Sequence, residues 1–249
     1  MRRTGLAPSP LFLLLLAATV AGGALAVADA GPARTGGIVL LVLGGWAASL
    51  CLHEFGHALL AYRGGDRSVR AKGYLTLDIR RYTDPVLSLL LPLLLLAAGG
   101  IPLPGGAVWI DRHSLRSRGV ESAVSLAGPL TNLVIGVALV ATVATGALPT
   151  GLAIGLSYLA LVQVLAFVIN ILPVPGLDGF GALEPYLSPQ ARRFAATVRP
   201  FAPLVLFVII ISVPVVAGAL FGITGAVFGA IGGDLGAADA GLGEFLFWR

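Results

Sequence analysis

Charge and cysteine are scarce in this chain of 249 residues. Only 11% of its residues are charged, against about 25% in soluble globular domains, and 57% are hydrophobic, which excludes an ordinary soluble enzyme. The one cysteine, Cys51, excludes an internal disulfide and a cysteine-rich metal site. Lysine is almost missing as well, since Lys72 is the one basic residue that is not arginine. In such an apolar chain, the net charge of +4 indicates membrane topology and contact with anionic lipid, not nucleic-acid binding.

Long apolar runs are what the chain has instead. Residues 11–28, 120–148 and 201–231 each contain at most one charge, and each is long enough to cross a hydrocarbon core about 30 Å thick. Two further apolar segments, 38–62 and 152–172, have the length of a span. The sequence therefore predicts an all-α polytopic membrane protein with five crossings, organised as a single domain over residues 1–249.

The basic residues give the predicted spans an orientation. Fourteen of the sixteen fall on one side of this topology, Arg34 and Arg249 being the exceptions, and positive residues are retained in the cytoplasm. We therefore expect a multi-pass protein of a bacterial cell membrane with a cytoplasmic N-terminus. Arg2 and Arg3 before the first run would also fit a signal peptide, but the remaining apolar chain needs an orienting first span.

Two further segments are not predicted to be single membrane-spanning helices. Residues 85–110 are interrupted by Pro92 and by Gly99-Gly100, and basic clusters flank both ends. A re-entrant segment satisfies both flanks, because non-helical backbone is tolerated at membrane depth where protein or water covers it; two very short spans are the alternative, giving about six helices. Residues 71–80 alternate in polarity, which favours a hairpin-like element at the membrane surface. Its edge at 74–79 could pair with an unwound peptide.

Two of the three histidines stand in His53-Glu-Phe-Gly-His57, near the end of the apolar segment 38–62. The motif matches H-E-x-x-H on a helix. Residues four apart share a helix face, so both imidazoles can bind one zinc ion, with Glu54 beside them to take a proton from water. Ionisable groups inside an apolar span are costly unless they are paired or liganded. A zinc site is therefore favoured over a satisfied polar cluster.

A hydrolytic zinc site needs a third protein ligand and keeps one position for water. The candidates are Asp178, His113, Glu184 and Cys51. Cys51 falls on nearly the opposite helix face from the motif, which removes it. His113 stands in a charged loop and Glu184 near a predicted surface turn. Asp178 follows a helix end interrupted by Pro and Gly, where membrane proteins place ions. These arguments favour Asp178 and leave His113 open.

Three motifs together resemble the site-2 protease family of intramembrane zinc metalloproteases. They are His53-Glu-Phe-Gly-His57, Ser125-Leu-Ala-Gly-Pro-Leu-Thr-Asn132 and Asn170-Ile-Leu-Pro-Val-Pro-Gly-Leu-Asp-Gly179, in the family's order. The resemblance covers residues 38–189, which we take as the catalytic core. The spans 11–28 and 201–231 would then be additions to it. No PDZ or CBS domain is expected in this compact form.

The resemblance implies a ligand set and a reaction. It implies that His53, His57 and Asp178 bind one Zn²⁺ per chain and that Glu54 is the catalytic base. It implies that Asn170 holds the substrate backbone or the developing oxyanion. The implied substrate is a transmembrane protein, such as an anti-sigma factor or a similar membrane-bound regulator, which is cut near the cytoplasmic face.

Three other interpretations stay open at this stage. Asn132 has a plain explanation as a hydrogen bonder between helices, with Gly128 and Gly136 allowing close approach. The enzyme could be a broad membrane peptidase that clears signal-peptide remnants. The zinc site could also belong to a transporter or an idle scaffold, although the spans offer almost no staged acidic or histidine residues for a transport path.

Overall fold

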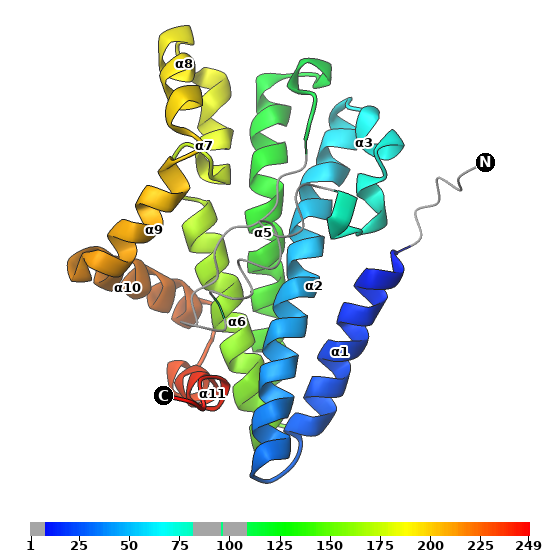
Figure 1. Cartoon of the computed structure of the whole chain (residues 1–249), viewed down its shortest axis with the longest axis vertical. Coiled ribbons are helices and arrows are strands. Elements are labelled where there is room, and N and C mark those ends of the chain that lie inside the picture. The colour runs from blue at the N-terminus through cyan, green and yellow to red at the C-terminus, as the bar shows by residue number, and fades with distance from the viewer. Residues whose placement is uncertain (1–7, 82–95, 97–108) are drawn as a thin grey trace.

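The computed structural model describes residues 8–81, 96 and 109–249, and every regular element within these ranges is helical. The all-α class is confirmed for this part of the chain. Four helices run side by side along the long axis of the molecule (Figure 1): α1 (Pro10–Ala26), α2 (Pro32–Gly64), α5 (Arg118–Val143) and α6 (Thr150–Asn170). The shorter elements are α3 (Ser68–Ala71), η1 (Tyr74–Thr76), η2 (Ile79–Arg81), η4 (Arg112–Ser114), α7 (Asp178–Leu183), η5 (Glu184–Tyr186), α8 (Pro189–Val198), α9 (Ala202–Ser212), α10 (Pro214–Ala230) and α11 (Leu235–Phe245).

Local signals in the sequence place the helix ends. Ser9 and Ser117 cap α1 and α5 by accepting a hydrogen bond from a backbone N–H of the first turn. Helix α2 ends at Gly64 and is followed by Gly65, whose φ of 131° is costly for any residue with a side chain. Pro129 lies inside α5, and the helix continues through it.

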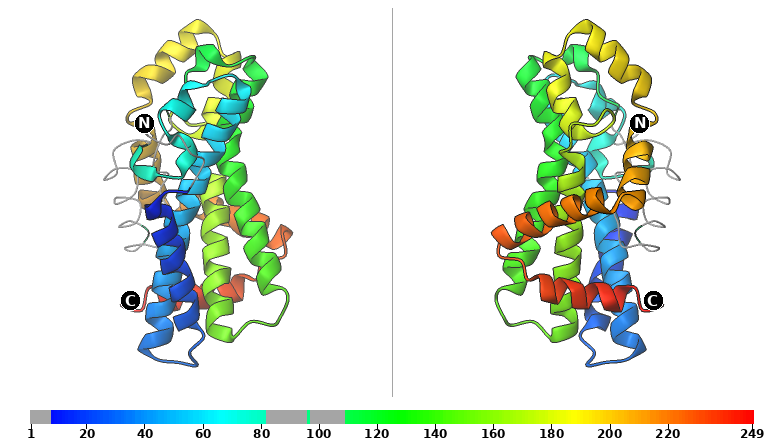
Figure 2. Two further views of the ribbon diagram at one scale, coloured as in Figure 1. Left: turned by 90° about the vertical axis from the view of Figure 1, so that its right-hand side faces the viewer. Right: turned by 90° about the vertical axis from the view of Figure 1, so that its left-hand side faces the viewer.

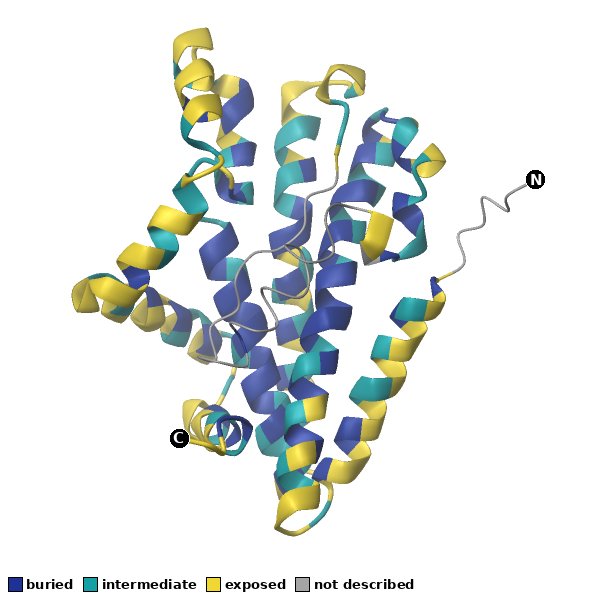
Figure 3. Ribbon diagram, viewed as in Figure 1, coloured by how far each residue is buried: buried dark blue, intermediate teal, exposed yellow. Residues whose placement is uncertain are grey.

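Within the described residues, three helices, α2, α5 and α6, are long and apolar enough to cross a membrane, and the bent pair of α8 and α9 would make a fourth. The apolar helices α1 and α10 have 17 residues each. Side chains on the outer faces are apolar and exposed, for example Leu14, Val134 and Val215 at 65, 66 and 78%. Figure 3 shows buried residues concentrated along α2 and α6, in the centre of the bundle. Apolar surface outside a packed centre is what a membrane protein presents to lipid.

The final span predicted over 201–231, which Pro203 and Pro214 were expected to kink or delay, is interrupted. The chain breaks at Val213, and Pro214 begins the new helix α10. Proline cannot donate the backbone hydrogen bond that a continuing helix would need. Helix α10 and the following α11 both lie across the long bundle helices (Figure 2).

The predicted surface hairpin over residues 71–80 is also wrong. The segment forms the end of α3 and the helical turns η1 and η2. Gly73 and Leu77 have φ of 77° and 56°, and these left-handed residues on either side of η1 interrupt an extended strand. The residues that alternate in polarity therefore form tight turns and not strands. Of the predicted re-entrant segment 85–110, residues 85–95 and 97–108 lie outside the described residues.

Candidate metal centre

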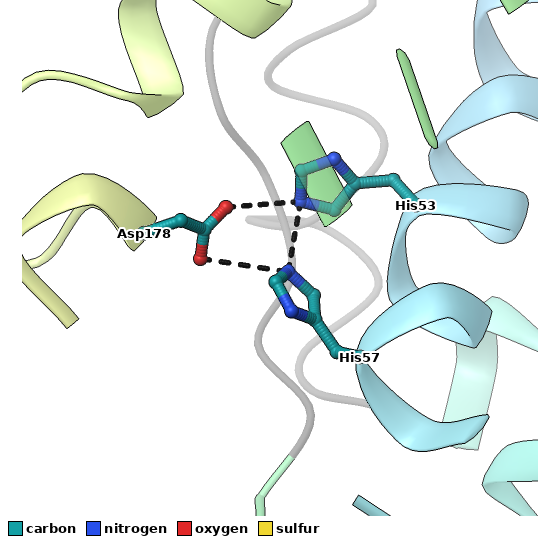
Figure 4. A group of neighbouring side chains, drawn as sticks. All are labelled: His53, His57 and Asp178. Carbon is teal, nitrogen blue, oxygen red and sulfur yellow. Dashed lines mark hydrogen bonds and ion pairs between the residues drawn. The ribbon is translucent and has the colours of Figure 1, made fainter. Parts of the chain in front are cut away.

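The two histidines of the motif project from one face of α2, as Figure 4 shows. His53 and His57 are one helical turn apart, and both are buried, with 6 and 7% of their surface exposed. Their Nε2 atoms lie 3.1 Å from each other. The helical spacing expected from the sequence therefore brings two imidazole nitrogens to one point inside the bundle.

Asp178 reaches the same point from the other side of the site. Helix α6 ends at Asn170, the chain turns through 171–177, and Asp178 is the first residue of α7. Gly176 has φ of 102°, and a side chain on Gly179 would collide with the backbone oxygen of Ile171. These two glycines let the chain fold back sharply, so that the first turn of α7 lies against the end of α6.

The three side chains meet at separations suited to a shared metal ion (Figure 4). The carboxylate oxygens of Asp178 lie 3.2 Å from Nε2 of His53 and 3.4 Å from Nε2 of His57. Bonds of about 2.0–2.1 Å at tetrahedral angles put the ligand atoms of zinc about 3.3 Å apart. The three residues form a group that could hold a metal ion.

In the neutral form of each ring, the hydrogen bond on its far side places the hydrogen on Nδ1 and leaves Nε2 with a lone pair. Nδ1 of His57 lies 2.7 Å from the backbone oxygen of Val124. A carbonyl can only accept, so Nδ1 carries the hydrogen of the neutral ring. Nδ1 of His53 lies 2.5 Å from Oδ1 of Asn132 and carries a hydrogen for the same reason. Two nitrogen lone pairs and a carboxylate then face one another, which is favourable only around a cation.

Glu54 and a polar cavity complete the surroundings of the cluster. Glu54 is 1% exposed, and it lines a cavity of about 360 Å³ together with the three clustered residues. Asn170 lines the same cavity, and its amide donates to the backbone oxygen of Ala166 at 3.0 Å. Water and a peptide segment would find polar partners in this space. The oxyanion role expected of Asn170 stays a prediction.

The other three candidate ligands lie elsewhere. His113 is exposed in η4. Glu184 is buried, but its carboxylate pairs with Arg199 and with Arg112, the latter at 2.5 Å. Cys51 is part of the hydrophobic core. The structure thus brings Asp178 to the histidines and engages Glu184 with arginines.

Sequence reasoning missed Ser49 and Gln163. Both are buried, with 3 and 0% of their surface exposed, and they hydrogen-bond to each other at 2.9 Å. Gln163 also accepts a hydrogen bond from Asn132, the partner of His53. The available signal was a glutamine near the middle of the mostly apolar run 152–172, since a polar residue within a span usually has a partner.

Comparison with known proteins identifies relatives. The chain is 47% identical over 215 residues to "Putative zinc metalloprotease Rip2" of Mycolicibacterium smegmatis, a match covering 84% of this chain and 83% of the relative. It is 44% identical over 227 residues to the protein of that name from Mycobacterium tuberculosis H37Rv, covering 89 and 87%. The chain belongs to the site-2 protease family. A more distant relative, "Putative zinc metalloprotease YwhC" of Bacillus subtilis, is 29% identical over 174 residues, covering 66% of this chain and 77% of the relative.

Membership of the site-2 protease family makes the chain a zinc metalloprotease and a membrane protein. The donor set fits zinc, which is commonly bound by imidazole and carboxylate. No family model matches the chain, and no solved structure matches it.

Proposed function

We propose that this chain is an intramembrane protease in which His53, His57 and Asp178 bind the zinc ion and Glu54 is the general base. The observation that carries the proposal is the meeting of two imidazole lone pairs and a carboxylate at separations of 3.1–3.4 Å. The buried carboxyl of Glu54 lines the same cavity. Its position one residue after His53 puts it next to the cluster on α2.

Each residue has a distinct part in the proposed reaction. Zinc, when bound, supplies a Lewis acid that lowers the pKa of water and polarises the peptide carbonyl. Glu54 takes the proton from the attacking water and delivers it to the leaving amine. Asn170 holds the substrate backbone or the developing negative charge on the carbonyl oxygen. The two histidines and Asp178 would hold the zinc ion beside Glu54 and Asn170.

We propose that the site lies close to the cytoplasmic face of a bacterial cell membrane. His57 precedes Gly64, the last residue of α2, by seven residues, or about 10 Å along the helix. Arg63, Arg118 and Arg192 belong to α2, α5 and α8, whose ends lie together at one end of the bundle (Figure 1). Positive residues favour the cytoplasmic side. The same reasoning gives a multi-pass topology with a cytoplasmic N-terminus.

The substrate that we propose is a transmembrane segment of another membrane protein, such as an anti-sigma factor or a similar regulator. The backbone amides of a transmembrane helix are paired within that helix. The peptide must therefore unwind locally before one of its bonds can reach Glu54 and the residues that would hold the zinc ion. Helix-breaking residues near the cytoplasmic end of the substrate should mark the bonds that are cut.

Cleavage of three matched model substrates by the purified protein tests the proposal. They share one transmembrane helix and carry a proline near the cytoplasmic end, a proline near the opposite end, or none. The cytoplasmic-end substrate should be cut fastest, and Glu54→Gln should cut every substrate at least about 100-fold more slowly than the wild type. Cleavage at the opposite end, or none by the wild type, would contradict the proposal. Equal cleavage of these and of unrelated signal-peptide remnants would instead support a broad clearing peptidase.

A further inference from the structure

Four buried polar side chains form a hydrogen-bond network that starts in α2 and returns to it. Ser49 of α2 donates to the backbone oxygen of Trp46 at 2.7 Å, and Gln163 of α6 donates to Oγ of Ser49 at 2.9 Å. Asn132 of α5 donates to Oε1 of Gln163 at 2.9 Å. Its Oδ1 lies 2.5 Å from Nδ1 of His53. The hydrogen-bond network therefore connects three helices and ends on a residue of the candidate metal centre.

The first link sets the direction of every later one. The Trp46 carbonyl can only accept, so the Ser49 hydroxyl must donate to it. Oγ of Ser49 then accepts from the amide nitrogen of Gln163, which turns the amide oxygen of Gln163 toward Asn132. Asn132 donates to that oxygen, and its own oxygen is left to face His53. An acceptor in this position requires a hydrogen on Nδ1, so Nε2 keeps its lone pair.

Burial makes this direction hard to change. Gln163 and Asn132 are 0 and 4% exposed, and leaving a buried polar group without a hydrogen-bond partner is destabilising. Turning a single amide over would oppose two donors or two acceptors at both of its links. Hydrogen bonds that only held the helices together could run in either donor-to-acceptor order. The order observed here leaves His53 in the one neutral form that can bind a metal through Nε2.

We propose that Gln163 and Ser49 are positioning residues, which hold His53 through Asn132 in the tautomer and orientation that zinc requires. Neither residue is among the three clustered residues; they act on the hydrogen-bond partner of a ligand. Removal of a direct hydrogen-bond partner of a ligand, the position that Asn132 holds, typically changes metal affinity by about 10–100-fold, and Gln163 sets the orientation of that partner. The inference rests on the proposed role of His53 as a ligand.

Gln163→Leu removes the central side chain of the hydrogen-bond network. Without the acceptor of Gln163, the Asn132 amide can turn over and present an N–H to Nδ1 of His53. That arrangement favours a hydrogen on Nε2, where it opposes metal binding. Gln163→Glu keeps an oxygen acceptor toward Asn132 in both its protonated and its ionised form, so it is the conservative counterpart. Val164→Ala is the matched control, because Val164 is the next residue of α6 and is 0% exposed. Its side chain takes no part in the hydrogen bonds that link Ser49 to His53.

The zinc dissociation constants of the full-length variants, measured in detergent by chelator competition, test the inference. Gln163→Leu should bind zinc about 10–100-fold more weakly than the wild type and should alter the visible absorption of the cobalt-substituted protein. Val164→Ala should lower the midpoint of thermal unfolding while leaving zinc affinity within about twofold, and Gln163→Glu should stay closer to the wild type than Gln163→Leu does. If Gln163→Leu does not fold, Ser49→Ala, which removes the first donor, should weaken zinc binding in the same direction by a smaller factor.

Equal zinc affinities of Gln163→Leu and Val164→Ala would overturn the inference, and so would equal losses in Gln163→Leu and Gln163→Glu. For Ser49→Ala, an affinity equal to that of the wild type would do the same. These results differ from a failure of the proposed function, in which the wild type itself would bind no zinc or would keep it without His53.

Discussion

The backbone of Gly128 in α5 lies directly against the Nε2 atom of His57 in α2. A methyl group at this position would overlap with that atom and with Nε2 of His53. The open side of Gly128 therefore borders the space in which a metal ion bound by both histidines would sit. This explains why a glycine in the motif 125–132 matters to the metal centre on another helix.

Gly128→Ala should reduce both zinc affinity and cleavage. The added methyl group must displace at least one imidazole, and overpacking of this kind costs about 1–3 kcal/mol, or about 10–100-fold in zinc affinity. Gly119→Ala is the matched control in α5, because its methyl group would meet no neighbouring atom closer than 3.9 Å. Chelator competition with both variants checks the prediction. An alanine at 128 that binds zinc as tightly as one at 119 would contradict it.

Glu54→Gln should separate chemistry from metal binding. The amide keeps the size of the side chain but cannot take a proton from water, so cleavage should fall by about 10²–10⁴-fold. Zinc content should stay at one ion per chain, because the proposed ligands are unchanged. Metal analysis and cleavage on the same sample make the measurement. Residual cleavage near the wild-type rate would remove Glu54 from its role.

Glu184→Gln should leave zinc in place while lowering stability. The Glu184 carboxylate holds Arg112 and Arg199, which belong to separate segments around the cavity. Loss of its charge should cost about 1 kcal/mol, because both arginines are partly exposed to solvent. The midpoint of thermal unfolding and the zinc content of the variant give the two readouts. A variant that loses zinc would return Glu184 to the list of ligands.

The residues of the candidate metal centre could be predicted from short sequence motifs. His53 and His57 share a helix face by spacing alone, and an Asp after a Pro-Gly interruption was the best third candidate. The structure brings Asp178 to both histidines, as that argument expected. The hydrogen bond between Asn132 and another helix was expected as well, but not that His53 itself would be one of its partners.

The elements that the sequence missed depend on backbone geometry and long-range pairing. Alternating polarity at 71–80 could not show that Gly73 and Leu77 would adopt left-handed conformations. Pro214 signalled an interruption of the span 201–231, but the sequence could not show that the helix after it would lie across the bundle (Figure 2). The partners of Gln163 lie on helices 31 and 114 residues away in the chain. No local pattern contains that information.

The measurement that tests the account most directly is the zinc content of the detergent-purified wild type beside Asp178→Ala and His113→Ala, with cleavage of a model transmembrane substrate scored on the same samples. The account predicts one zinc ion per chain in the wild type and in His113→Ala, both of which should cleave. Asp178→Ala should lose most of its zinc and all detectable cleavage. Zinc retained in Asp178→Ala, or lost in His113→Ala, would contradict the proposed ligand set.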